Sequence, residues 1–194
     1  MRYDDVHQFF GWPDRPQVFD PQGAGARAYA DEVKRKIRSE LRRRFPALTV
    51  ETGVLAADPN SDSTEVPIAI VCEFSSGASE DALRQAHRLA WNFSRTALLI
   101  TLEPHRLLAW SCWLDPQQAM KDLQVKELRE LPKVPGVALN ALQSSVRDLL
   151  HWVSLITGNY LKQQPKKFRS NKRADALLLE NLRVVRRELL ALGL

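Results

Sequence analysis

The chain has 194 residues, of which 44% are hydrophobic and 26% are charged, and its formal net charge is +5. This length can bury a core of its own, and this composition argues against wholesale disorder. Two cysteines are too few for a disulfide framework, and no stretch has the apolar length of a signal-peptide core or a membrane span. We expect a cytoplasmic protein with no membrane partner, and its positive charge favours polyanionic partners.

The first predicted helix spans residues 25–45 and follows a lead-in over residues 1–22, which holds one short helical turn and is otherwise irregular. Apolar side chains recur at every fourth position of this helix: Tyr29, Val33, Ile37 and Leu41. Pro46 ends it. Basic side chains cover its other faces, among them Arg35, Arg38, Arg42 and Arg43. A surface of this kind fits contact with phosphates.

A sheet is predicted from the apolar runs in the middle of the chain. The elements, in order, are strands at 48–56 and 66–74, a helix at 79–93 capped by Ser79, and strands at 96–102 and 106–114. The run at 66–74 is apolar on both faces, which is typical of a strand at the centre of a covered sheet. Residues 115–137 are mixed, and Pro135 and Gly136 mark a boundary there.

Two helices are predicted at the end of the chain, over residues 139–160 and 174–189, because apolar residues recur at helical spacing. A basic connector joins them, with Phe168 interleaved. Its cations are Lys162, Lys166, Lys167, Arg169, Lys172 and Arg173. Such a cluster fits phosphate neutralisation, and the simpler alternative is a solvated loop. We therefore divide the chain into an α/β domain over residues 1–135 and a helical extension over residues 136–194.

One carboxylate, Glu73, lies at the end of the apolar run IAIVCEF, where a charge needs a partner, a ligand or an open cleft. If the first two strands pair as an antiparallel hairpin, Glu73 lies opposite Glu51. Asp58 and Asp62 lie in the connecting loop, about 20 Å away along the strand. The geometry therefore predicts that Glu51 and Glu73 form the acid pair.

The order of elements resembles the PD-(D/E)xK nuclease fold in the version found at the N-terminus of restriction proteins. The resemblance rests on Glu73 at its strand end, the following helix DALRQAHRLAWNF and the next strand TALLITL. It implies that Glu51 and Glu73 would ligate Mg²⁺, which prefers oxygen ligands, and that Gln85 would orient the water or the phosphate. These three residues are the candidate catalytic set.

The chain departs from that family at the position two residues after Glu73, where Ser75 stands in place of the family's lysine. The resemblance therefore implies a nuclease-like fold that does not cleave, with Glu51, Glu73 and Gln85 as vestiges of a site. A further alternative treats Glu73 as an ordinary strand-end charge that pairs with Arg84 or Arg106.

The end of the chain resembles the helical segment that precedes the methylase domain in some bacterial N6-adenine DNA methyltransferases of type IIG and phage-defence systems. The resemblance rests on His151-Trp152, Gly158, Phe168, Arg173-Ala174-Asp175 and Leu192-Gly193-Leu194. It implies a methylase or another defence-system domain as a partner. The Gly-rich cofactor strand and the Asn-Pro-Pro-Tyr-type motif of that methylase do not occur in these 194 residues.

The sequence as a whole predicts an α/β protein with a restriction-endonuclease-like mixed sheet flanked by helices and a C-terminal helical extension. The expected function is that of a DNA-binding, non-cleaving module of a bacterial restriction-modification or phage-defence protein. It would hold DNA through the helix at 25–45 and the connector at 162–173. The alternatives are an active Mg²⁺-dependent endonuclease and a protein–protein scaffold whose terminal helices form the docking surface.

Overall fold

The computed structural model describes residues 1–60, 62, 66–93, 96–132, 138–168 and 174–191. At its centre is a five-stranded sheet whose strands follow one another in chain order. They are β1 (Val50–Leu55), β2 (Ala69–Phe74), β3 (Leu98–Glu103), β4 (Arg106–Ser111) and β5 (Gln124–Leu128). Strands β2 and β3 are parallel and the other neighbours are antiparallel, so the sheet is mixed. The predicted α/β fold class is confirmed.

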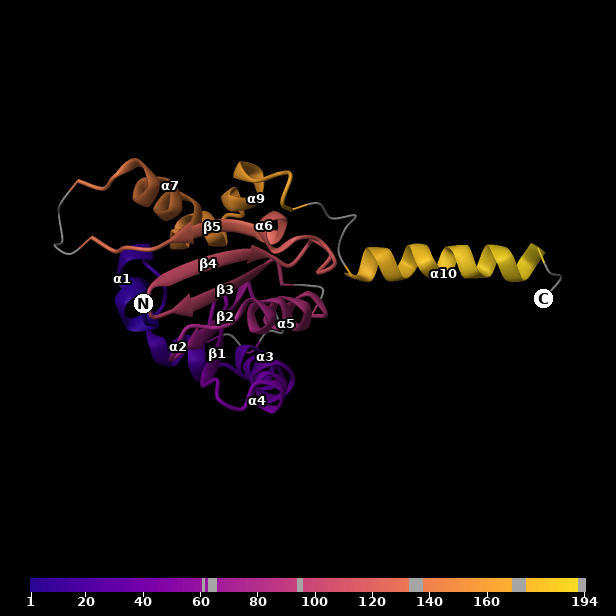
Figure 1. The fold of residues 1–194 in the computed structure, drawn as a ribbon, viewed down its shortest axis with the longest axis horizontal. Coiled ribbons are helices and arrows are strands. Elements are labelled where there is room, and N and C mark those ends of the chain that lie inside the picture. Colours follow the sequence, from indigo (N-terminus) through magenta and orange to yellow (C-terminus); the bar gives the residue numbers. More distant parts are fainter. Residues whose placement is uncertain (61, 63–65, 94–95, 133–137, 169–173, 192–194) are drawn as a thin grey trace.

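Helices lie on both faces of this sheet (Figure 1). They are α1 (Tyr3–Phe10), α2 (Arg15–Phe19), α3 (Ala24–Val33), the π-helical segment η1 (Lys34–Arg38), α4 (Ser39–Arg44), α5 (Glu80–Trp91), α6 (Met120–Leu123), α7 (Ala141–Leu150), α8 (Trp152–Ile156), α9 (Asn159–Gln163) and α10 (Ala174–Ala191). Helix α5 makes the crossover that the parallel pair β2–β3 requires.

The core forms two clusters because successive residues of a strand point to opposite faces of the sheet. On β2, Val71 belongs to the cluster under α1, α2 and α7–α9, whereas Ile70 and Cys72 belong to the cluster under α3–α4 and α5. The lead-in over residues 1–22 is thus part of the core. Its Trp12 indole donates a hydrogen bond to the carbonyl of Leu150 at 2.8 Å.

The helix predicted at 25–45 is continuous but changes its winding in the middle. Val33, Ile37 and Leu41 are all fully buried, although they lie four residues apart. In a regular α-helix, side chains four apart drift by about 40° per step around the axis. The wider turn of η1, marked by the bond from the Ser39 amide to the Lys34 carbonyl, compensates for that drift. It keeps the whole stripe on the core.

The single long helix predicted over residues 139–160 is wrong. His151 has ψ 142°, which ends α7, and its side chain accepts a hydrogen bond from the Val153 amide that starts α8. Gly158 then adopts a φ of +70°, which interrupts the helix a second time. The three short helices wrap over the sheet, and Val146 and Leu149 belong to the same core cluster as β5.

Helix α10 extends away from the rest of the chain (Figure 1). Its large apolar side chains are exposed to solvent, namely Leu178, Leu179, Leu182, Val184, Val185, Leu189 and Leu190. Within the described part of the chain, the structure holds no helix with both the length and the apolarity needed to cross a membrane.

His87 on α5 is buried and gives the fold a pH dependence. Its Nε2–H donates to the Ser111 carbonyl at 2.7 Å, and its Nδ1 has no hydrogen-bond partner among the described residues. Burial lowers the pKa of His87 below its ordinary value, and the bond to Ser111 only partly offsets this. The unfolded chain therefore binds a proton that the folded chain rejects, and stability falls as the pH drops.

We expect the free energy of unfolding to decrease by up to about 2 kcal/mol between about pH 7 and about pH 5, on either side of the ordinary histidine pKa. Urea unfolding of the wild type and of His87→Gln at both pH values measures it, because the glutamine variant lacks this contribution. His105→Gln, at an exposed position, is the control and should keep the wild-type dependence. Equal pH dependence in all three proteins would contradict the assignment.

Candidate functional site: an acid pair closed by Arg15

The predicted acid pair is confirmed by the strand register. Glu51 on β1 lies directly opposite Glu73 on β2. The two side chains differ in burial, since that of Glu73 is 11% exposed and that of Glu51 is 51% exposed. Like charges that face each other across a strand pair are destabilising, so this pair needs a cation.

Arg15, the first residue of α2, supplies that cation. Its Nη1 lies 2.7 Å from Oε2 of Glu73, and its Nη2 lies 2.9 Å from Oε2 of Glu51. Asp4 on α1 approaches Nη1 at 3.4 Å. Burial opposes the charge of Arg15, but the hydrogen bond and the charge of Glu73 outweigh it, so the pKa of Arg15 is raised above its ordinary value. One guanidinium thus bridges both carboxylates.

The position of Arg15 follows from how α2 packs on β1. Asp14 begins the helix with a capping box, and Pro16 stands in its first turn. Gly53 on β1 allows the helix to approach closely, because a Cβ atom there would lie 2.8 Å from the Val18 carbonyl oxygen. The Phe19 ring centroid lies 4.4 Å from the guanidinium carbon of Arg15. Capping, close packing and a cation–π contact together fix the guanidinium over the acid pair.

The acid pair lines a pocket of about 650 Å³, together with Arg15, Ser75 and Asp5 of α1. Mg²⁺ requires near-octahedral oxygen ligands, and a fixed guanidinium already takes an oxygen of each carboxylate. Ser75 stands two residues after Glu73, just past the end of β2, and its hydroxyl donates to the Thr49 carbonyl at 3.3 Å. Among the described residues, no three His, Cys, Asp or Glu side chains gather into a metal site. As folded, the site does not fit Mg²⁺.

The third candidate catalytic residue, Gln85, is not brought to the acid pair. It lies on α5, lines a different pocket and accepts a hydrogen bond from Arg44 Nη1 at 3.3 Å. The alternative partners predicted for Glu73 are wrong as well. Arg84 pairs with Glu80 at 3.1 Å and Arg106 pairs with Glu103 at 2.8 Å. Glu73 is a paired strand-end charge, but its partner comes from the lead-in.

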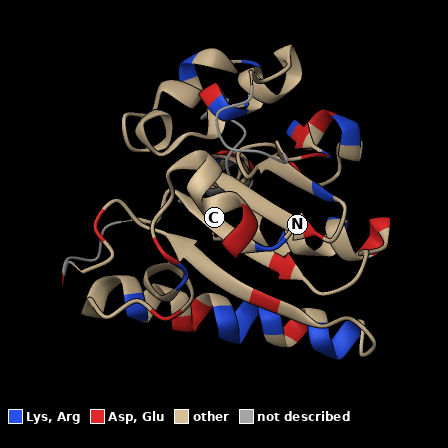
Figure 2. Ribbon diagram, turned by 90° about the vertical axis from the view of Figure 1, so that its left-hand side faces the viewer, with Lys and Arg blue, Asp and Glu red and all other residues tan. Residues whose placement is uncertain are grey.

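The predicted basic helix runs along the lower edge of the molecule, and its cations differ in whether they form ion pairs (Figure 2). Arg35, Arg38 and Arg42 line one shallow pocket of about 490 Å³. Among the described residues, none of the three has an ion pair, and Nε of Arg38 is buried without a hydrogen-bond partner. Arg43 differs, because it binds Glu40 at 2.6 Å on the same helix. Two of the unpaired cations, Arg35 and Arg38, thus lie within the π-helical segment η1, and Arg42 lies beyond it on α4.

The predicted basic connector at residues 162–173 is only partly described, and its described cations differ in their contacts. Lys166 is exposed, whereas the Lys167 ammonium donates to the Asp122 carbonyl at 2.5 Å. Phe168 is buried, and its ring lies edge-on to Tyr160 with the centroids 5.3 Å apart. Three predicted DNA-binding cations lie outside the described residues, namely Arg169, Lys172 and Arg173. The described part of this connector is therefore anchored to the body of the protein.

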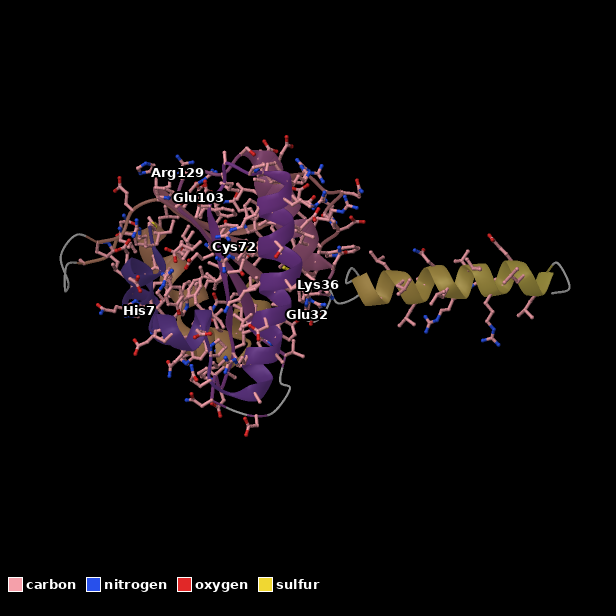
Figure 3. All side chains as sticks on the ribbon, turned by 90° about the horizontal axis from the view of Figure 1, so that it is seen from below. His7, Glu32, Lys36, Cys72, Glu103 and Arg129 are labelled. Atoms are coloured by element: carbon pink, nitrogen blue, oxygen red, sulfur yellow. The ribbon has the colours of Figure 1, made fainter. Side chains whose placement is uncertain are left out.

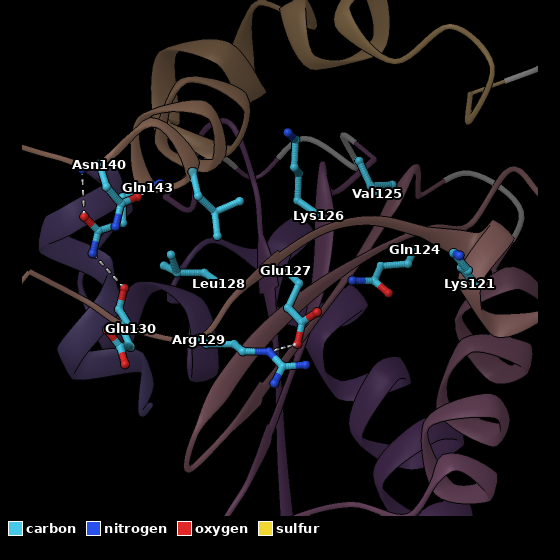
Figure 4. A pocket seen from close by; sticks show the side chains of 11 residues that line it. Lys121, Gln124, Val125, Lys126, Glu127, Leu128, Arg129, Glu130, Asn140 and Gln143 are labelled. Atoms are coloured by element: carbon cyan, nitrogen blue, oxygen red, sulfur yellow. Dashed lines mark hydrogen bonds and ion pairs between the residues drawn. The ribbon is translucent and has the colours of Figure 1, made fainter.

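A further pocket, of about 670 Å³, lies between β5 and the start of α7 (Figure 4). Its polar groups largely satisfy one another. Glu127 pairs with Arg129 at 2.8 Å, and the Gln143 amide donates to the Glu130 carbonyl at 3.2 Å. The Lys126 ammonium donates to the Ser145 hydroxyl at 3.2 Å. Each of these groups thus has a partner within the pocket or beside it.

Sequence reasoning placed Glu51 and Glu73 together but missed Arg15. The only local signal was the pattern Asp14-Arg15-Pro16, which is typical of a helix start and says nothing about the acids. Comparison with models of protein families, with curated proteins and with solved structures finds no match to this chain.

Proposed function

We propose that the protein is a DNA-binding α/β module that does not cleave, and that it holds the DNA backbone with the basic face of its first long helix. The single observation that carries this proposal is the row of Arg35, Arg38 and Arg42. Three guanidiniums on one face, without ion pairs in the described structure, carry charge that a phosphate can neutralise. Guanidiniums also match phosphate oxygens in geometry.

The proposal that the module does not cleave rests on Arg15. A hydrolytic metal site needs carboxylate oxygens free to ligate, and here the guanidinium engages both Glu51 and Glu73. Arginine also stays protonated, so it does not replace the lysine that helps to activate water in active nucleases. The placement of such a module in a restriction-modification or phage-defence protein is supported by the sequence resemblance alone.

A salt titration of DNA binding tests the proposal. Each lost phosphate contact reduces the slope of log affinity against log salt by about 0.9 on a duplex. We expect the triple variant Arg35→Ala, Arg38→Ala, Arg42→Ala to bind a labelled duplex more weakly and with a slope smaller by about 2–3. Fluorescence anisotropy over a range of salt concentrations measures both quantities.

The matched control removes three arginines from another helix, through Arg183→Ala, Arg186→Ala and Arg187→Ala on α10. This variant has the same net charge as the first, so a loss that depended only on net charge would appear equally in both. If both triple variants weaken binding alike, or if the wild type does not bind duplex at low salt, the proposed surface is wrong.

A further inference from the structure

Two adjoining pockets lie between the first long helix and α5. One, of about 420 Å³, is lined by η1 and α4 on one side and by Leu89, Asn92 and Phe93 on the other. The other, also of about 420 Å³, lies between the end of α4 and α5, and Pro116 and Gln117 close its far side. No residue lines both pockets, but neighbouring residues do, namely Arg43 and Arg44 on α4 and Leu89 and Arg88 on α5. The two pockets thus follow one another along the seam between the helices, named here the α4–α5 groove.

The walls of the α4–α5 groove carry six cations, contributed by both helices: Arg35, Lys36, Arg43, Arg44, Arg84 and Arg88. Three of them pair with acids of their own helix, such as Lys36 with Glu32 at 2.6 Å (Figure 3). Exposed pairs of this kind are weak and exchange readily with other anions. Arg35 and Arg88 have no ion pair within the described part of the chain. Two acids, Glu40 and Asp81, line the same pockets, so cations outnumber acids on the walls and leave positive charge that phosphates can engage.

The floor of the groove is apolar and partly aromatic. Phe45, Leu89 and Phe93 are partly buried and pack on the second core cluster from the side of the groove. The ammonium of Lys36 lies 5.5 Å from the centroid of the Phe93 ring. Phosphate-binding cations beside aromatic rings are the combination that proteins use to bind single strands, because every base can stack on a ring.

The aromatic ring in the groove favours one form of nucleic acid. The bases of a duplex stack on one another and offer no free face to Phe93, whereas each base of a single strand has a face that can stack on the ring. We propose that the α4–α5 groove binds a single strand of nucleic acid, with phosphates on the arginines of its walls and a base against Phe93. This inference rests on the proposed function, since it names the form of nucleic acid that the basic surface takes.

The test compares a labelled oligothymidylate with its duplex by fluorescence anisotropy on the full chain. We expect the wild type to bind the single strand more tightly than the duplex. Phe93→Leu keeps an apolar side chain but loses the ring, so we expect it to bind the single strand about tenfold more weakly and the duplex unchanged. Arg88→Glu reverses an exposed charge that the fold does not use, and it should weaken single-strand binding at least as much.

Arg129→Glu, at the residue just after β5, is the control for the charge reversal and should leave single-strand binding close to wild type. Urea unfolding shows whether Phe93→Leu is folded. If it is not, the single-strand affinity of Arg88→Glu is the measurement that tests the groove. If Arg88→Glu binds the single strand as tightly as the wild type does, the groove is not the binding site. The same holds if the wild type binds the duplex more tightly than the single strand. Either result overturns the groove proposal and leaves the DNA-binding proposal intact. A chain that binds neither form at low salt overturns the groove together with the proposed function.

Discussion

Replacing Arg15 by alanine is expected to lower the free energy of unfolding by about 2–3 kcal/mol near neutral pH. The variant leaves Glu73, which is 11% exposed, facing the negative charge of Glu51 with no counter-ion. It also removes the stacking of the guanidinium on Phe19. Solvent reaches Glu51, so the loss should lie below that of a fully buried pair. Urea unfolding followed by tryptophan fluorescence measures the change.

Two comparisons identify the cause of that loss. Arg84→Ala removes an arginine from an exposed pair with Glu80 and should cost less than about 0.5 kcal/mol. Adding Glu73→Gln to Arg15→Ala removes the repulsion and should restore part of the stability. Equal costs for Arg15→Ala and Arg84→Ala would contradict the bridging role.

The second large effect is expected at Gly53, through packing instead of charge. An alanine Cβ at this position would lie 2.8 Å from the Val18 carbonyl oxygen, which belongs to the backbone of α2 and cannot rotate away. Helix α2 must then shift from β1, at a cost of about 1–3 kcal/mol. Because Arg15 begins α2, the same shift pulls the guanidinium away from the acid pair.

Gly77→Ala is the matched control, since nothing lies within 4 Å of a Cβ at that position. It should leave stability unchanged or raise it slightly, because alanine restricts the unfolded chain. Thermal or urea unfolding of both variants measures the contrast. If Gly53→Ala were as stable as Gly77→Ala, the close approach of α2 to β1 would not be what fixes Arg15.

The sheet could be predicted where the pattern of side chains was strong. The bounds of the first two strands, paired as an antiparallel hairpin, placed Glu51 opposite Glu73, and β3 and β4 followed from continuous apolar runs. Strand β5 was missed because QVKEL contains only two apolar residues, Val125 and Leu128, among charged and polar ones. Its position depends on pairing with β4, which no local pattern of five residues reveals.

The counter-ion of the site depends on tertiary packing and was beyond local reasoning. Arg15 lies 36 residues from Glu51 and 58 from Glu73, and the helix that carries it has only five residues. Its placement follows from the contact between α2 and Gly53, which is visible only once the strand is folded. The helix break at His151 was also not predicted, because the apolar residues on either side of it continue at helical spacing.

The π-helical turn at Lys34–Arg38 has a consequence for how this helix tolerates insertions and deletions. A regular helix rotates by about 100° per residue, so a wide turn acts as one additional residue that the winding absorbs. Deleting one residue from KRKIR would therefore restore regular winding and leave everything downstream facing nearly as it does now. A further residue inserted into this helix, with the rest of its winding unchanged, would instead turn everything downstream by about 100°. The composition and nearly all of the charge would survive such an insertion, yet Leu41 would leave the core or Arg42 and Arg43 would face another direction. Which arginines share a surface therefore depends on how many residues separate them along the helix more than on which residues those are.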